Sequence, residues 1–250
     1  MALSHGFRHL AFEDVGSTNS LCVEEAEKGD PGQLWITGTR QLQGRGSRGR
    51  HWVSESGNLY ASLLLCEAGH LEKLHTLTFV ASLAIRDAIL CLPNAGLTKV
   101  DLKWPNDVLL NGKKTSGILL ESHLIRNQRY VVIGIGVNIE HFPVETLHPA
   151  TSLINEGLNT KPADFIQILS DAMANRLIQW NQGNGFASIR TDFLQAASNL
   201  GKTIEVRMPS KTQEPTRIGK FTGIDEQGLL LLEGSNGKIE RISVADIFFA

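Results

Sequence analysis

The sequence predicts an α/β (α+β) fold, in which a mixed, mostly antiparallel sheet with helices is followed by a small C-terminal β-barrel. Apolar runs of strand length recur up to residue 139, four stretches repeat apolar residues at helical spacing, and from residue 201 short strands alternate with tight turns. The chain has 250 residues, 42% of them hydrophobic, which suffices for one large domain and a small one. We therefore expect domains over residues 1–199 and 200–250.

The N-terminal part is predicted to form strand, helix and strand. Residues 9–13 alternate as a short strand does, and Ser17 or Thr18 caps an amphipathic helix that ends at Gly29. Residues 34–39 form the next strand, which leads into a loop rich in glycine and arginine.

The middle of the chain combines a buried strand, a long helix and a meander. Residues 58–65 are apolar enough for a mostly buried strand, and residues 71–92 have the spacing of a core helix that stops at Pro93. The dipeptide at 111–112, Asn-Gly, is typical of a type I′ hairpin turn, so the strands around it should run antiparallel. These strands cover residues 100–104, 108–110, 116–121 and 130–139.

Two helices and a small β unit complete the chain. Helices are predicted over residues 163–182, directly after Pro162, and over 186–198. Leu200 marks the expected boundary. Beyond it, turns at 225–228 and 236–237 separate the short strands of a predicted barrel, which cover residues 203–208, 217–224, 229–232, 238–242 and 245–249.

Composition and charge exclude several classes of protein. A net charge of −2 and a pI near 6.4 argue against nucleic acid as a partner, because binding to phosphate backbones needs a basic surface. No apolar run approaches the roughly 18 residues of a membrane span, so no membrane contact is expected. Cys22, Cys66 and Cys91 are widely spaced, which favours neither a disulfide framework nor a zinc site. We expect a cytoplasmic protein without a structural metal.

The loop of residues 43–52 interleaves three glycines with three arginines. Glycine lets the backbone approach a ligand closely, and guanidinium groups pair with phosphate or carboxylate oxygens. By itself the loop fits a solvated turn or a nucleic-acid patch as well as an anion site, but the net charge favours a small anion. The six residues are Gly44, Arg45, Gly46, Arg48, Gly49 and Arg50.

Lys103 is a second candidate for binding an anion. It ends an apolar strand just before Pro105, which forces an extended exit of the chain and so orients the ammonium group. The alternative is an edge lysine that reaches water. An ammonium group facing the arginines would repel them unless a polyanion lay between, so the pattern predicts a ligand with phosphate or carboxylate groups.

A polar pocket is predicted next to the anion site. The three hydrogen-bonding side chains of residues 17–19 exceed what one helix cap needs, and Gln41 adds a donor and an acceptor, so together they suit a small polar ring. Gly117, Gly134 and Gly136 lie inside apolar strands and indicate the close approach of a ligand or another backbone, with a β-bulge as the alternative.

Together these pieces resemble the biotin protein ligases (biotin–[acetyl-CoA-carboxylase] ligases), and they span about half the chain. The resemblance implies a catalytic domain related to class II aminoacyl-tRNA synthetases and lipoate ligases, with a C-terminal SH3-like domain. The matching motifs, in the family's order, are Ser17-Thr18-Asn19, Gly44-Arg45-Gly46-x-Arg48-Gly49-Arg50-x-Trp52, Gly57-Asn58-Leu59-Tyr60, Lys103-Trp104-Pro105-Asn106-Asp107, Gly117-Ile118-Leu119 and Gly134-Ile135-Gly136-x-Asn138.

The resemblance implies an enzyme that activates biotin with ATP and Mg²⁺ to biotinyl-5′-AMP and transfers it to a lysine of a biotin carboxyl carrier protein. Lys103 is the implied catalytic residue, and Asn106 or Asp107 would help to orient phosphate or Mg²⁺. The implied biotin-binding residues are Ser17, Thr18, Asn19, Gln41, Gly44, Arg45, Gly46, Ser47, Lys103, Gly117 and Gly134. The implied ATP-binding residues are Arg48, Arg50, Trp52, Asn106 and Asn138.

The chain departs from the family pattern at two points. Its first motif begins at residue 17, which leaves no room for the N-terminal DNA-binding domain of many bacterial members, so the short form without repressor function is expected. Ser47 stands where the family usually has an arginine associated with holding the activated intermediate; weaker retention is expected unless Arg48 substitutes. Two alternatives to biotin ligation are a lipoate or octanoate ligase of the same fold and a non-catalytic biotin sensor. A homodimer is one option for the assembly.

Overall fold

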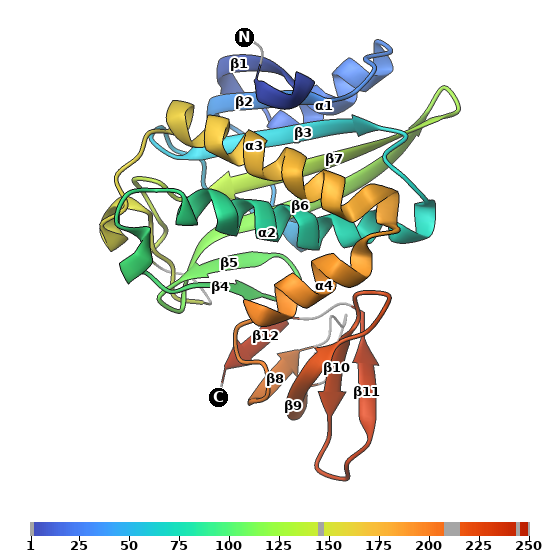
Figure 1. Cartoon of the computed structure of the whole chain (residues 1–250). Helices are drawn as coiled ribbons and strands as arrows, with labels where there is room; N and C mark the ends of the chain where they lie inside the picture. The colour runs from blue at the N-terminus through green and yellow to red at the C-terminus, as the bar shows by residue number, and fades with distance from the viewer. Residues whose placement is uncertain (1–2, 145–147, 208–215, 244–245, 250) are drawn as a thin grey trace.

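The computed structural model describes residues 3–144, 148–207, 216–243 and 246–249 of the chain (Figure 1). The helices are α1 (Thr18–Glu27), α2 (Leu77–Leu90), α3 (Pro162–Trp180) and α4 (Phe186–Gln195). The strands of the larger unit are β1 (Arg8–Val15), β2 (Leu34–Gln41), β3 (Leu59–Cys66), β4 (Val100–Lys103), β5 (Asp107–Leu110), β6 (Lys113–Ile125) and β7 (Gln128–Val137). The C-terminal strands are β8 (Thr203–Arg207), β9 (Thr216–Ile224), β10 (Leu230–Glu233), β11 (Ile239–Ile242) and β12 (Asp246–Phe249).

Two separate sheets organise the molecule. The first has seven strands in the order β1-β2-β3-β7-β6-β5-β4, and only β1 and β2 run parallel, which confirms the mixed, mostly antiparallel sheet. The second has five antiparallel strands in the order β11-β10-β9-β8-β12. Its edge strands β11 and β12 do not pair with each other within the described residues, so the predicted C-terminal barrel is an open sheet there.

The two faces of the seven-stranded sheet carry different layers. Helices α2 and α3 cover one face, where Leu63 and Ile133 belong to the main core (Figure 1). The next residues along the same strands, Leu64 and Val132, point to the other face and pack with Cys22 of α1 in a smaller core. Because α1 is short, it covers only part of that second face.

The predicted helices and strands all form, with changes at their ends. The long helix expected over residues 71–92 is a 3₁₀ segment, Leu71–Thr76, followed by α2. Asn111 and Gly112 have φ angles of 48° and 79°, as the predicted type I′ turn requires. Residues 208 and 245 of the predicted C-terminal strands lie outside the described residues.

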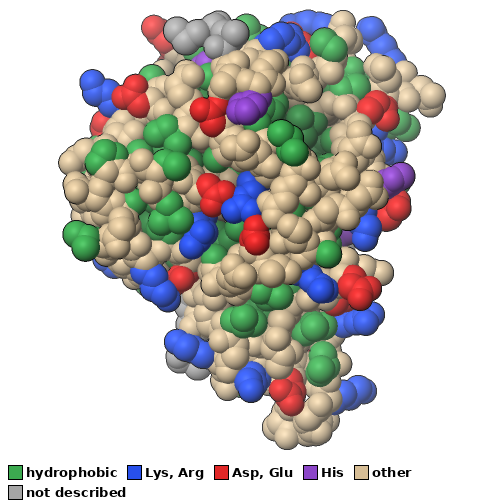
Figure 2. Space-filling view, in the orientation of Figure 1, with side chains coloured by type: hydrophobic (Ala, Val, Ile, Leu, Met, Phe, Trp, Pro, Cys, Tyr) green, Lys and Arg blue, Asp and Glu red, His purple; other side chains and the backbone are tan. Residues whose placement is uncertain are grey.

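Charged side chains pair across the outer surface of the helices. Arg176 of α3 pairs with Asp87 of α2 and Asp192 of α4. Figure 2 shows acidic and basic side chains in contact over the same helices. Among the described helices, none has the length and apolar character needed to cross a membrane.

Candidate active site

A cavity of about 380 Å³ opens on the face of the sheet that α1 leaves uncovered. Its volume lies within the range of small-molecule sites. Its walls come from the start of α1, the loop after β2, the middle of β6 and β7, and the segment after β7. The lining residues are Ser17, Thr18, Asn19, Gln41, Arg45, Gly46, Ser47, Arg50, His51, Trp52, Val53, Asn106, Lys114, Gly117, Ile118, Leu119, Gly134, Ile135, Gly136, Asn138, Pro143, His148 and Ala150.

One end of the cavity is a buried, hydrogen-bonded floor. The Thr18 backbone N–H and hydroxyl both donate to Gln41 Oε1, at 2.9 and 3.1 Å. Ser62 Oγ lies 2.7 Å from Thr18 Oγ1 and 2.6 Å from Asn19 Oδ1. Gln41 Nε2 in turn donates to Ser54 Oγ at 3.1 Å. These bonds fix the orientation of the carboxamide groups of Asn19 and Gln41, so the floor presents a defined set of donors and acceptors.

The helix start that supplies this floor is not capped by its own side chains. Ser17 occupies the N-cap position of α1 but makes no side-chain cap hydrogen bond within the described chain. The helix begins where it was predicted, but the predicted capping hydrogen bond from a side chain is not formed among the described residues. Thr18 and Asn19 are buried and point into the floor, where the N-terminal end of α1 also contributes a partial positive charge.

Asn19 links the floor to the charged groups of the cavity. Its Nδ2 donates to Glu121 Oε2 at 2.6 Å, and the Arg45 guanidinium lies 3.5 Å from the same oxygen. Gly134 is required by this packing, because a Cβ there would lie 2.2 Å from Asn19 Oδ1. The close approach predicted at Gly134 is thus made by a side chain of the protein itself.

The opposite end of the cavity carries Lys114 from the start of β6. Its Nζ lies 2.5 Å from Asp107 Oδ1 and 5.5 Å from the centroid of the Trp52 ring. A β-bulge orients it: in the pairing with β5, Leu109 faces Lys114 but Val108 faces Ser116, so Thr115 is an extra residue. The bulge brings Lys114 and Gly117 to the same face, although they are three residues apart.

Lys103 lies outside this cavity. It ends β4, at the edge of the sheet, where it pairs with Asp107, which pairs in turn with Gly117. The backbone of Lys103 is therefore two strands, roughly 10 Å, from Gly117 of the cavity wall. Its side chain is buried but does not line the cavity. The structure therefore places Lys103, the predicted catalytic cation, outside the cavity lining, and it places Lys114, which sequence reasoning missed, within it.

The glycine and arginine loop forms one side of the cavity. It folds back on itself through a bridge between Arg45 and His51, and the Gly46 N–H donates to the Arg50 carbonyl at 2.7 Å. Gly44 does not line the cavity. A Cβ at Gly44 would lie 2.4 Å from the Trp52 carbonyl oxygen, so the fold of the loop requires a glycine there. The side chain of Arg48 lies outside what the structure describes.

Trp52 lies across the two strand glycines. A Cβ at Gly136 would lie 2.6 Å from the indole, and one at Gly117 would lie 2.9 Å from it. The Trp52 indole N–H is buried and has no acceptor among the described residues. A buried donor beside a cavity is available to an acceptor on a bound molecule.

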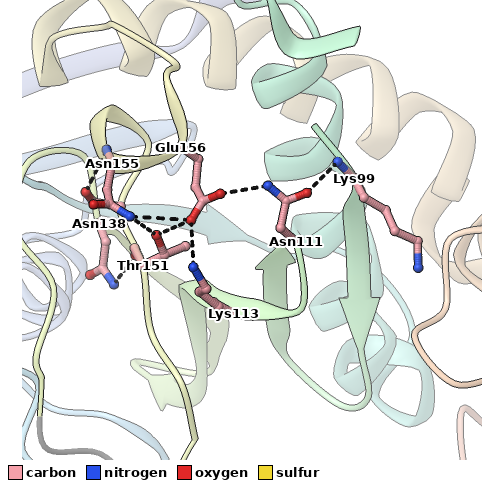
Figure 3. A network of polar contacts seen from close by, with 8 residues as sticks. Lys99, Asn111, Lys113, Asn138, Thr151, Asn155 and Glu156 are labelled. Atoms are coloured by element: carbon pink, nitrogen blue, oxygen red, sulfur yellow. Dashed lines mark hydrogen bonds and ion pairs between the residues drawn. The ribbon is translucent and has the colours of Figure 1, made fainter. Parts of the chain in front are cut away.

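A polar network holds the wall beyond β7 (Figure 3). Asn138 lines the cavity, and its Nδ2 donates to the Thr151 carbonyl at 3.0 Å. Thr151 Oγ1 and Asn111 Nδ2 each donate to the Glu156 carboxylate at 2.7 Å, and Lys113 Nζ lies 3.4 Å from it. Burial acts to raise the pKa of Glu156, but these hydrogen bonds and the lysine outweigh it, so its pKa lies below the usual value.

Comparison with known proteins agrees with this geometry. Residues 13–138 match the model of the Biotin/lipoate A/B protein ligase family, and residues 200–250 match that of the Biotin protein ligase C terminal domain. The chain is 39% identical over 242 residues to a biotin–[acetyl-CoA-carboxylase] ligase of Paracoccus denitrificans, covering 93% of this chain and 97% of the relative. The chain belongs to the biotin protein ligase family.

Solved structures of biotin protein ligases share the fold. The enzyme from Aquifex aeolicus in complex with biotin and ATP superposes with a TM-score of 0.77 at 25% identity and covers 96% of this chain and 97% of that one. The enzyme from Leishmania major in complex with biotinyl-5-AMP gives a TM-score of 0.67 at 25% identity, covering 95% and 99%.

The cavity unites most of the residues that the sequence predicted for a biotin protein ligase. Among the predicted residues whose side chains the structure describes, Gly44 and Lys103 do not line it, and the side chain of Arg48 lies outside the described part. Sequence reasoning missed Lys114 because strict alternation along the strand would place its side chain on the face opposite to that of Gly117. It missed His51, His148 and Ala150 because no sequence pattern distinguishes them. The predicted residues in the lining are Ser17, Thr18, Asn19, Gln41, Arg45, Gly46, Ser47, Arg50, Trp52, Asn106, Gly117, Gly134 and Asn138.

Proposed function

We propose that this chain is a biotin protein ligase that activates biotin with ATP and transfers it to a lysine of a biotin carboxyl carrier protein. One observation carries the proposal: a single cavity joins a hydrogen-bonded floor for a small polar ring to a cationic end for a carboxylate and a phosphate. The floor is formed by Thr18, Asn19 and Gln41, with Arg45 beside it against Glu121, and the cationic end is formed by Lys114.

In the first step a carboxylate oxygen of biotin attacks the α-phosphorus of ATP, and pyrophosphate leaves. Negative charge grows on the α-phosphate, and the Lys114 ammonium supplies the opposing charge in a partly enclosed site. Asp107 orients the ammonium group. By analogy with the loss of one oxyanion donor, this stabilisation amounts to about 3–4 kcal/mol. In the second step the acceptor amine attacks the biotinyl carbonyl, and AMP leaves.

The remaining polar groups suit the nucleotide. Asn106 directly precedes Asp107, the partner of Lys114, and Arg50 and Asn138 also line the cavity, where they could bind phosphate oxygens. Trp52 offers an aromatic face and an unsatisfied N–H. Mg²⁺ would arrive with the ATP phosphates, as it usually does at nucleotide sites.

Several further features follow as proposals from the family. The division into residues 1–199 and 200–250 is supported by the two separate sheets. The mixed seven-stranded sheet would fit a catalytic unit related to class II aminoacyl-tRNA synthetases, and the five-stranded antiparallel sheet would fit an SH3-like C-terminal unit. The negative net charge supports a ligase that works without nucleic acid. Cytoplasmic location and a homodimer stay predictions.

The test is an incubation with a biotin carboxyl carrier domain, MgATP, and either biotin or lipoate, read by the mass of the carrier. We expect one biotinyl group on the carrier with biotin and no change with lipoate. A carrier whose acceptor lysine is replaced by arginine is the control. Lipoyl transfer would identify a lipoate ligase, and biotin binding without any transfer would identify a sensor; either result would overturn the proposal.

A further inference from the structure

The C-terminal unit meets the catalytic unit through the turn of residues 225–229, between β9 and β10. The Gly228 carbonyl accepts a hydrogen bond from the buried Trp104 indole N–H at 3.0 Å, and His75 Nε2 lies 2.6 Å from the Gln227 carbonyl oxygen. Figure 1 shows this end of the C-terminal sheet beside α4, whereas the turn between β10 and β11 lies at the far end of the molecule.

The turn fits closely against the helices. Gly228 has a φ of +79°, and a Cβ there would lie 2.9 Å from the ring of Phe79 on α2 and 3.7 Å from that of Phe186 on α4. The turn is also held internally, because Asp225 Oδ1 accepts hydrogen bonds from the N–H groups of Gln227 and Leu229. A turn that is fixed by its own hydrogen bonds and packs closely can hold the residues that it contacts in place.

Trp104 begins the segment of residues 104–107 that joins β4 to β5 and reaches the cavity wall. Asn106 and Ile118 exchange two hydrogen bonds: Asn106 Nδ2 donates to the Ile118 carbonyl at 2.7 Å, and the Ile118 N–H donates to the Asn106 carbonyl at 3.1 Å. Asp107 then pairs with Lys114. The segment is therefore held at one end by the C-terminal turn and at the other end by Ile118 and Lys114.

We propose that the turn of residues 225–229 is a positioning element for the adenylation step. Through Trp104 it sets the segment of residues 104–107, and through Asp107 it sets the ammonium group of Lys114. The inference rests on the proposed function. The ring-binding floor belongs to α1, β2 and β3, and none of its hydrogen bonds described above involves this segment. The turn should therefore affect adenylation without affecting the binding of biotin alone.

The test compares Gly228→Ala with Gly237→Ala. Both glycines have left-handed φ angles, +79° and +73°, but a Cβ at Gly237 meets no described atom within 4 Å. The two substitutions thus impose similar backbone strain, and only the first disturbs the contact. Trp104→Phe is a second variant, which removes the N–H donor and keeps an aromatic ring. Each protein is assayed well below its melting temperature for biotin-dependent ATP–pyrophosphate exchange and for biotin affinity by calorimetry.

We expect Gly228→Ala and Trp104→Phe each to lower the exchange rate at saturating substrates about tenfold or more, because small misplacements of catalytic groups are costly. Biotin affinity should stay within about twofold, and Gly237→Ala should match the wild type. The double variant Trp104→Phe/Gly228→Ala should lose little more than the worse single variant, since both act through one contact.

Exchange at the wild-type rate in both contact variants would overturn the inference, as would equal losses in exchange and in biotin affinity. Fully additive losses in the double variant would also overturn it. Wild-type protein without any exchange would instead refute the proposed function. The wild-type and Gly237→Ala rates therefore separate the two failures.

Discussion

At the scale of single residues, the Thr18 hydroxyl lies at the centre of the polar floor. It donates to Gln41 and lies within hydrogen-bond distance of Ser62. Thr18→Val keeps the shape of the side chain and removes this group, which leaves Ser62 and Gln41 less constrained. We expect biotin to bind about tenfold more weakly, or about 1.4 kcal/mol, in calorimetry.

The control for this variant is Thr39→Val, an exposed threonine on the same strand as Gln41. Its biotin affinity should equal that of the wild type. If Thr18→Val also bound biotin with wild-type affinity, the assignment of the floor to the biotin ring would be wrong.

Ser47 raises a second question at the residue scale. It lines the cavity, and its Oγ accepts a hydrogen bond from Arg50 at 3.0 Å. Ser47→Arg would add a guanidinium group that can reach the intermediate, so escape of biotinyl-5′-AMP in a stopped-flow chase should slow about tenfold or more. Ser47→Ala, which adds no charge, should not slow it. Unchanged escape from Ser47→Arg would mean that another group already fills this role.

The two lysines mark how far the sequence can predict the site. The anion loop, the polar residues 17–19 and Gln41 are predictable, because their chemistry is visible in their residue types. The choice between Lys103 and Lys114 is not predictable in this way. It depends on the bulge at Thr115, and nothing in the alternation of the strand indicates a bulge there.

At the scale of elements, the segment after β7 depends on one carboxylate. Glu156 is 10% exposed and accepts hydrogen bonds from Thr151 and Asn111 (Figure 3). Because its pKa is lowered in the folded protein, its charged form stabilises the fold above the unfolded pKa of about 4.3, and this contribution is lost as the pH falls through the folded value.

Glu156→Gln should therefore lower the free energy of unfolding by about 1–3 kcal/mol at pH 7, measured by urea denaturation. The difference from the wild type should shrink as the pH falls below about 4.3. Glu72→Gln, at an exposed glutamate, is the control. A difference that stayed constant with pH would show that Glu156 acts through packing and not through its charge.

Local patterns account well for the individual elements. The type I′ turn at residues 111–112 and the helix after Pro162 follow from residue types that favour those conformations. The 3₁₀ segment at residues 71–76 was not predicted, because helical spacing of apolar residues does not distinguish a 3₁₀ start from an α-helix.

At the scale of the whole molecule, the order of the strands lies beyond local patterns. The parallel pairing of β1 with β2 and the insertion of β7 between β3 and β6 are long-range contacts. The site depends on this order, because it brings together lining residues from the segments 17–19, 41–53, 106–119 and 134–138 with Pro143, His148 and Ala150. Periodicity predicts that these segments exist, and only the folded chain decides which of their side chains meet.

The most direct test of the cavity as the site of adenylation compares Lys114→Met with Lys103→Met. Both proteins are assayed for biotin-dependent ATP–pyrophosphate exchange at saturating substrates and well below their melting temperatures. Lys114→Met should lose about 10²-fold to 10³-fold in rate, as expected for the loss of one preorganised charge at the reacting phosphate. Lys103→Met should lose at least about ten times less, because its side chain lies outside the cavity. An equal or larger loss in Lys103→Met would contradict the assignment of Lys114.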